Sequence, residues 1–357
     1  MAAHAAPLLS VRNLMTHFPL DEGTVIAVEG VSFDVFSGGT LGIVGESGCG
    51  KSVTARSILQ ILDRPGRIVG GEILFRPRSG SGVPGNGDIV DLAKLAPNSR
   101  GMRSIRGAEI GYIFQEPMAA FSPVHTIGNQ IVEAIRLHRK MGKKEARAVA
   151  IEMLRRVGIP SPEERIDAYS YQLSGGLRQR ALTAMALSCN ASLLIADEPT
   201  TALDVTTQVQ ILKLMGELQK QYGMALIFIT HNMGIIAQTC EAVVVMYLGQ
   251  VMESAPVDDI FHAPRHPYTQ ALLRSIPRLR SKSKEKLASI VGSVPHPYNR
   301  PHGCLFHPRC SAFMPGTCDE QVPSVVPIGP RHSVRCLLYP LPDVGHSSSN
   351  QAGAPST

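Results

Sequence analysis

The chain has 357 residues, of which 44% are hydrophobic and 18% are charged, with a formal net charge of +6 and seven cysteines. This size and mix suit one large globular domain with an appendage. The absence of an apolar run of roughly 18 residues argues against a membrane span, and so few, unevenly placed cysteines argue against a disulfide framework. The opening residues, MAAHAAPLLS, lack the basic and apolar regions of a signal peptide, so we expect a cytoplasmic protein.

The first third of the chain is rich in short apolar segments that predict β-strands. These segments lie at 9–14, 31–35, 40–44, 71–75 and 109–114. A glycine-rich turn follows the third segment, and the apolar spacing after it predicts a helix at about 52–62. Residues 76–87 are rich in Gly, Pro and Ser, which is typical of a surface loop.

The middle of the chain has helical patterning, and strands return after it. Apolar spacing near 3.6 predicts helices at 131–137, 146–157 and 177–187, followed by strands at 193–196, 225–229 and 243–247. Strands that alternate with helices indicate an α/β fold with a mainly parallel sheet. We therefore expect an α/β domain at 1–262 with an inserted helical subdomain at about 116–188, an extension at 263–340 and a disordered tail at 341–357.

The glycine-rich turn matches the pattern G-x-x-x-x-G-K-[ST], with a strand before it and a helix after it. Its backbone N–H groups can converge on an anion, and the helix adds its positive N-terminal end. Lys51 would reach the β and γ phosphates, and the Ser52 hydroxyl would ligate Mg²⁺. The alternative is an ordinary strand–helix turn. The residues that we expect to contact ATP here are Gly45, Ser47, Gly48, Cys49, Gly50, Lys51, Ser52 and Val53.

Two carboxylates follow the apolar strand predicted at 193–196. The carboxyl end of a parallel strand faces the crevice where such sheets bind ligands. Asp197 is therefore placed to hold Mg²⁺, and Glu198 to act as the base that polarises the attacking water. Two solvated carboxylates at a strand end are the alternative interpretation of this pair.

Residues 173–180 read LSGGLRQR, which closely resembles the LSGGQ signature of the ABC ATPases. Gln115 resembles the Q-loop glutamine of that family, Asp204 belongs to a D-loop-like ALD, and His231 resembles the H-loop histidine. The resemblance implies that Gln115 and His231 join Glu198 in catalysis, and that Gln115 joins Ser52 and Asp197 around Mg²⁺. His231 alone would be read as an ordinary histidine at a strand end. Phe18 is a candidate for the aromatic residue that stacks on adenine, with a surface or core role as the alternative.

The signature segment has a physical logic of its own. Ser174, Gly175 and Gly176 precede a predicted helix, so they present a hydroxyl, open N–H groups and a positive helix end. In the family this segment acts in trans, because two ATPase subunits sandwich two nucleotides, and Asp204 belongs to the same contact. Leu177 departs from the family's glutamine, so that side chain's role is not carried over.

Several segments, among them GYIFQEPM, DEPTTALDVTTQVQIL and HPYTQALL, resemble the oligopeptide/dipeptide importer branch of the family. Four cysteines, spaced C-x₅-C-x₇-C-x₁₇-C, lie near the C-terminus, and cytosolic cysteines this close together suggest a metal site. In this branch the corresponding cysteines are associated with a [4Fe–4S] cluster. Zinc and unligated buried thiols are the alternatives. The residues concerned are Cys304, Cys310, Cys318 and Cys336.

The same resemblance implies the partners. We expect two transmembrane permeases, a second and related ATPase subunit, an extracytoplasmic solute-binding protein, and a peripheral position on the cytoplasmic face of the cell membrane. The scattered basic residues favour solvated helix faces over a nucleic-acid surface. The solute would be a dipeptide or oligopeptide, with nickel, glutathione or an oligosaccharide as alternatives. A single ATPase half and the lack of a heptad run argue against a soluble ABC ATPase acting on nucleic acid.

Overall fold

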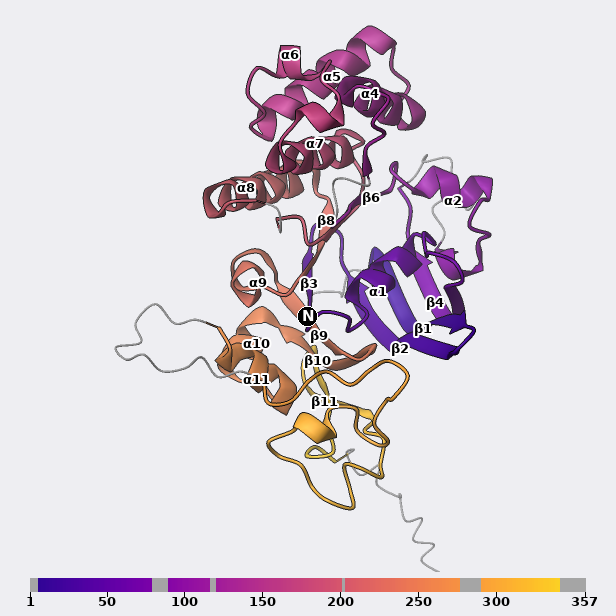
Figure 1. The fold of residues 1–357 in the computed structure, drawn as a ribbon, viewed down its shortest axis with the longest axis vertical. Helices are drawn as coiled ribbons and strands as arrows, with labels where there is room; N and C mark the ends of the chain where they lie inside the picture. The colour runs from indigo at the N-terminus through magenta and orange to yellow at the C-terminus, as the bar shows by residue number, and fades with distance from the viewer. Residues whose placement is uncertain (1–5, 79–88, 116–119, 201–202, 277–289, 341–357) are drawn as a thin grey trace, which may run out of the picture.

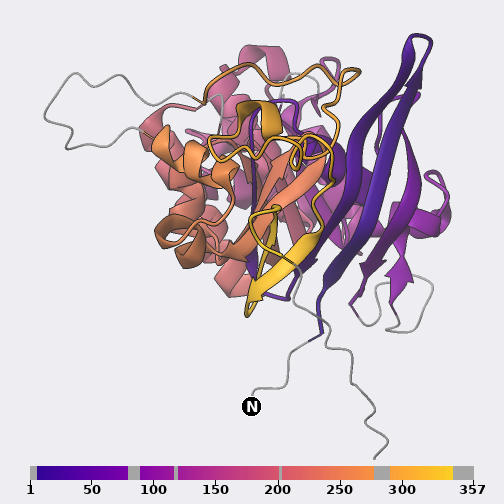
Figure 2. The same cartoon turned by 90° about the horizontal axis from the view of Figure 1, so that it is seen from below.

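The computed structural model describes residues 6–78, 89–115, 120–200, 203–276 and 290–340. It contains two sheets with helices packed around them (Figures 1 and 2). The predictions at 116–119, at Ala202 of the D-loop-like segment, in most of the loop 76–87 and in the tail 341–357 lie outside these residues. None of the described helices is long and apolar enough to cross a membrane.

The larger sheet has eight strands in the order β11-β12-β10-β9-β3-β8-β7-β6. Its parallel part is formed by β6, β7, β8, β3 and β9, and β10, β12 and β11 extend it with antiparallel pairs. The α/β class with a mainly parallel sheet is confirmed. The strand bounds are β3 Thr40–Val44, β6 Ile110–Ile113, β7 Leu193–Asp197, β8 Ala225–Thr230, β9 Ala242–Tyr247, β10 Gln250–Pro256, β11 Val325–Gly329 and β12 His332–Arg335.

The smaller sheet is antiparallel and has the order β2-β1-β4-β5. Figure 2 shows β1 and β2 as two long strands at one side of the molecule. Its strands are β1 Leu9–Leu20, β2 Gly23–Val35, β4 Arg67–Phe75 and β5 Val90–Asp91. The first two run longer than the predicted 9–14 and 31–35, because their outer parts pair with each other in a hairpin.

Helices cover the sheets and form the upper lobe of Figure 1, where α4, α5, α6 and α7 gather together. The helix predicted at 52–62 ends earlier, since Gln60 adopts a positive φ of 50° and the chain turns toward Pro65. The helix bounds are α1 Lys51–Ile58, α2 Arg100–Ile105, α4 Ile127–His138, α5 Lys143–Arg156, α6 Pro162–Arg165, α7 Gly175–Ser188, α8 Val205–Tyr222, α9 Met233–Thr239, α10 Val257–His262 and α11 Pro267–Arg274.

The parallel strands are buried on both faces, so successive side chains enter two different cores. Ile195 and Ile227 pack with α1 and the smaller sheet, whereas Leu194 and Leu226 pack with the helices on the opposite face. This alternation follows from the pleat of a strand. Each fully buried side chain of this size contributes about 1.5–3 kcal/mol. The central strands are therefore fixed in register, and their carboxyl ends are held at one edge.

Candidate functional site

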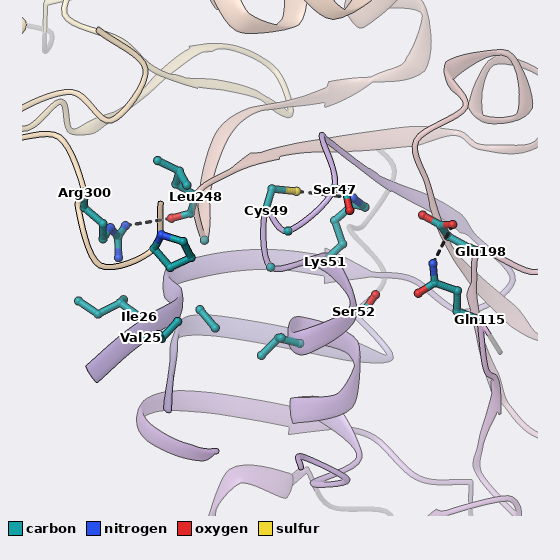
Figure 3. Close-up of a pocket in the computed structure, with 16 residues that line it drawn as sticks. Val25, Ile26, Ser47, Cys49, Lys51, Ser52, Gln115, Glu198, Leu248 and Arg300 are labelled. Carbon is teal, nitrogen blue, oxygen red and sulfur yellow. Dashed lines mark hydrogen bonds between the residues drawn. The ribbon is translucent and has the colours of Figure 1, made fainter. Parts of the chain in front are cut away.

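Residues 45–50 connect β3 to α1, and residues 47–53 line a cavity of about 220 Å³ (Figure 3). Two glycines of the connecting loop are required by close backbone approaches. A Cβ on Gly45 would lie 2.2 Å from the Met246 carbonyl oxygen, and one on Gly50 would lie 2.4 Å from the Ala27 carbonyl oxygen. Both also have positive φ, at 153° and 96°, which favours glycine. The loop is thus a fixed backbone cradle at the start of a helix.

Lys51 is buried in this cradle, with only 5% of its surface exposed. Its Nζ donates hydrogen bonds of 2.9 Å to the carbonyl oxygens of Gly45 and Glu46. Carbonyl groups orient the ammonium without neutralising its charge, so the positive charge remains available to an anion in the cavity. Gly48, Cys49, Gly50, Ser52 and Val53 line the same cavity, together with Ser47.

Asp197 ends β7 and lies beside the start of α1. The Ser52 hydroxyl donates to Asp197 Oδ1 at 3.0 Å, and the Tyr112 hydroxyl donates to Oδ2 at 2.8 Å. Burial raises the pKa of Asp197, and the two hydroxyl donors partly oppose that shift. A hydroxyl and a carboxylate in contact are oxygen ligands of the kind Mg²⁺ prefers, and Mg²⁺ needs few protein ligands when phosphates supply the others. The donor set fits Mg²⁺.

Glu198 stands at the centre of a polar group beside the cavity. Gln115 Nε2 donates to Glu198 Oε2 at 3.1 Å (Figure 3). His231 Nδ1 lies 3.3 Å from Glu198 Oε1. Glu198 adopts a positive φ of 47°, a strained conformation for a residue other than glycine, and such strain gathers at functional sites. The structure therefore brings Gln115, Glu198 and His231 together, as the sequence led us to expect.

The signature residues lie elsewhere and do not line the cavity. Ser174 caps α7 by accepting a 3.3 Å hydrogen bond from the Leu177 N–H, and Gly175 and Gly176 form the first turn of that helix. A Cβ on Gly175 would meet nothing within 4 Å. Asp204 caps α8 through Thr207, whose N–H and hydroxyl lie 2.9 and 2.7 Å from its carboxylate. These hydrogen bonds lower the pKa of Asp204.

Phe18 also lies outside the cavity. It pairs with Val25 across the β1–β2 hairpin, and its ring lies against Gly66, where an added Cβ would be 2.4 Å away. The residues that wall the cavity at this end are instead Val25 and Ile26 of β2, with Pro297 and Arg300 from the C-terminal part of the chain. Sequence reasoning missed these four, because nothing near them in the sequence marks them.

The prediction of an iron–sulfur cluster is wrong. Within the described ranges, no group of three or more His, Cys, Asp or Glu side chains is placed to hold a metal ion, which also removes the zinc alternative. Burial raises the pKa of three of the four thiols, to about 11 for Cys336. The structure thus holds the four as free, mostly buried thiols: Cys304, Cys310, Cys318 and Cys336.

Comparison with known proteins agrees with this arrangement. The ABC transporter family pattern matches residues 28–201, and the pattern of the oligopeptide/dipeptide transporter C-terminal region matches residues 252–318. A putative peptide import ATP-binding protein of Brucella melitensis is 48% identical over 93% of this chain and 97% of its own length. The chain belongs to the ABC transporter family. Within that family it belongs to the oligopeptide/dipeptide transporter branch.

Two further likenesses support the family assignment and the fold. The dipeptide transport ATP-binding protein DppD of Escherichia coli is 45% identical over 95% of this chain and 98% of its own length. The dimeric ATP-binding cassette MJ0796, bound to ADP and phosphate, superposes with a TM-score of 0.61 at 24% identity, over 70% of this chain and 98% of that one. The ABC ATPase core therefore has the expected architecture, and the remaining share of the chain lies beyond it.

Proposed function

We propose that this chain is the ATP-hydrolysing subunit of an ABC importer that drives uptake of dipeptides or oligopeptides. The observation that carries the proposal is the group at the carboxyl ends of β3, β7 and β8, where Lys51 and Glu198 line one cavity. Asp197 and His231 lie directly behind its lining, in contact with Ser52 and Glu198. The relatives at 45% and 48% identity are named for peptide import or dipeptide transport, which favours peptides over nickel, glutathione or an oligosaccharide.

The P-loop holds the phosphates of ATP. Backbone N–H groups at the start of α1 converge on them, and Lys51 turns its ammonium from two backbone carbonyls toward the β and γ phosphates. The adenine of ATP would lie away from the P-loop, against the apolar side chains of Val25 and Ile26 that line the cavity. Arg300, which also lines that end, completes the wall.

Ser52, Asp197 and Gln115 would hold Mg²⁺, which would neutralise the charge that develops on the phosphates. Glu198 is the base that orients and deprotonates the attacking water. Gln115 and His231 hold its carboxylate from two sides at 3.1 and 3.3 Å, so the base is fixed before water arrives. Such preorganisation is the main way proteins speed phosphoryl transfer.

The second half of each site comes from another subunit. Ser174, Gly175, Gly176 and Asp204 stay at the surface of this chain, where they can meet the nucleotide of a related ATPase subunit in a heterodimer. Two permeases and a solute-binding protein complete the complex, which sits on the cytoplasmic face of the membrane. Residues 1–262 form the motor and 263–340 its extension.

Reconstitution tests this proposal. The full chain is assembled with its related ATPase subunit and the two permeases in proteoliposomes, and uptake of a labelled dipeptide is followed with the binding protein outside and ATP inside. We expect uptake that requires hydrolysis and that Lys51→Ala abolishes. Uptake without ATP, or full uptake in the Lys51→Ala complex, would refute the function.

A further inference from the structure

An ion pair joins the P-loop to the C-terminal part of the chain across 263 positions of sequence. Arg309 Nη1 lies 2.6 Å from Glu46 Oε2, and Arg309 Nη2 lies 2.9 Å from Oε1, so the contact is bidentate. The arginine side chain is 4% exposed and the glutamate side chain 24%. A fork-to-fork contact of this kind fixes the orientation of the carboxylate as well as its position.

Glu46 is the second residue of the P-loop, and each of its polar groups has a partner. Its backbone N–H donates to the Tyr268 hydroxyl at 2.9 Å, and its carbonyl oxygen accepts the 2.9 Å hydrogen bond from Lys51 Nζ. Its side chain is held by Arg309. Glu46, which accepts a hydrogen bond from the Lys51 ammonium, is thus held in place by Tyr268 and Arg309, both of which follow residue 262 in the sequence.

Arg309 is itself held firmly. Its Nε donates to the Val291 carbonyl oxygen at 3.2 Å, and its guanidinium lies 5.8 Å from the centre of the Tyr247 ring. Phe306, three residues earlier, packs against the rings of Tyr247 and Tyr268 at 5.3 and 5.2 Å between centroids. The guanidinium of Arg309 is therefore positioned by packed side chains around it when it contacts Glu46.

The pair also has an electrostatic role at an anion site. Glu46 places a carboxylate in the loop where the phosphates of ATP would bind, and a bare negative charge there would repel them. Arg309 neutralises that charge while leaving the Lys51 charge unpaired by any carboxylate bond that the structure records. Removing Arg309 would both loosen the loop and expose the phosphates to the Glu46 charge.

We propose that Arg309 is a positioning residue for nucleotide binding, which holds the P-loop through Glu46 and makes the C-terminal region part of the ATP site. The inference rests on the proposed function, since it takes the cavity to bind MgATP. Pro297 and Arg300 of the same region line that cavity, and Arg300 is fixed there by a 2.7 Å ion pair to Glu29.

The test is titration of the full chain with MgATP. Arg309→Met should raise the dissociation constant about 10- to 100-fold, because a charge-assisted contact is lost and a charge is left unpaired. Arg309→Lys should fall in between, since an ammonium cannot make the bidentate contact. Adding Glu46→Gln to Arg309→Met should recover only part of the lost affinity, because it removes the unpaired charge but does not restore the contact that holds the P-loop.

Arg147→Met is the matched control, because it breaks an exposed bidentate pair with Asp167 in the helical lobe, at 2.9 and 2.7 Å. Its affinity should equal that of wild type. In the assembled transporter Arg309→Met should raise KM for ATP by the same factor and leave kcat within about two-fold. A loss of stability alone would not raise KM while leaving kcat unchanged.

Three results separate the possible failures. Wild-type affinity in Arg309→Met would overturn the inference, and so would a double variant that binds MgATP as tightly as wild type, since the ion pair would then hold nothing that nucleotide binding needs. If wild type binds MgATP no better than Lys51→Ala does, the proposed function itself fails, and the inference falls with it.

Discussion

The P-loop and the signature segment both place glycines at the start of a helix, but their surroundings differ. The P-loop is enclosed by the backbones of Ala27 and Met246 and by the contacts of Glu46, and its lysine is buried. The signature glycines have open space around Gly175, and only Ser174 engages the helix end. In the proposed function, the enclosed P-loop supplies one half of the phosphate site within this chain, and the open signature segment supplies the other half to a second ATPase subunit.

The largest expected effect lies on the enclosed side. Glu198→Gln keeps the shape and the hydrogen bonds to Gln115 and His231 but removes the base, so kcat should fall about 10²- to 10⁴-fold. MgATP affinity should stay near that of wild type, unlike in Lys51→Ala. Stopped-flow phosphate release from the assembled transporter measures this change. Turnover at the wild-type rate would show that Glu198 is not the base.

The open side should respond only in the complex. Ser174→Ala removes a hydroxyl from the signature segment, so turnover in the assembled transporter should fall about 10- to 100-fold, the value of a hydrogen bond to a charged group. MgATP affinity of the separate chain should not change. Ser174→Asn controls for the helix cap, which asparagine preserves. Equal losses in the separate chain would contradict an action in trans.

The stability of the folded chain should fall in acid because of a buried histidine near the P-loop side. His266 accepts the Tyr268 N–H on its Nδ1 at 3.0 Å, and burial lowers the pKa of His266 to about 3. Between that value and 6.5 the unfolded state binds more protons, so stability is full above pH 6.5 and falls as the pH falls. The loss at pH 5 should be about 2 kcal/mol. Urea unfolding at pH 7 and pH 5 measures it.

His266→Asn is the matched variant for this pH effect, because asparagine can accept the Tyr268 N–H but does not titrate. Its unfolding midpoint should change less between pH 7 and pH 5 than that of wild type. An equal change in both proteins would assign the acid sensitivity to other groups.

The smallest effect is expected at Gln115, which contacts Glu198. Gln115→Ala removes the 3.1 Å contact to Glu198, so transport-stimulated hydrolysis should fall about five-fold, with MgATP affinity less affected. Parallel measurement of both quantities with and without the permeases decides it. If both fall equally, Gln115 contributes to binding and does not couple hydrolysis to transport.

Local pattern was sufficient for the P-loop and for the carboxylates at the end of β7, because in both places the strand and the residues that follow it are adjacent in the sequence. It was not sufficient for the wall of the cavity. Phe18 fitted the family position for an aromatic residue, yet its ring packs on Gly66, and the cavity is closed by Arg300 instead. The Arg309–Glu46 pair joins residues 263 positions apart, a contact that no periodicity or spacing encodes.

For the cysteines, the sequence pattern predicted a site that the structure does not contain within the described residues. Their close spacing suggested ligation, but spacing does not report the direction or the protonation of a thiol. Burial raises the pKa of Cys304 and Cys336 in the structure, and burial depends on what packs over them. Chemistry that depends on tertiary surroundings was therefore the least predictable part of the chain.

The position of β3 has a consequence for synthesis on the ribosome. This strand pairs with β8 and β9, whose residues begin at Ala225 and end at Tyr247, so its two neighbours emerge almost 200 residues later. At ordinary translation rates the strand waits about 10–40 s with both edges unpaired. During that time the two unpaired edges of β3 make the nascent chain prone to aggregation.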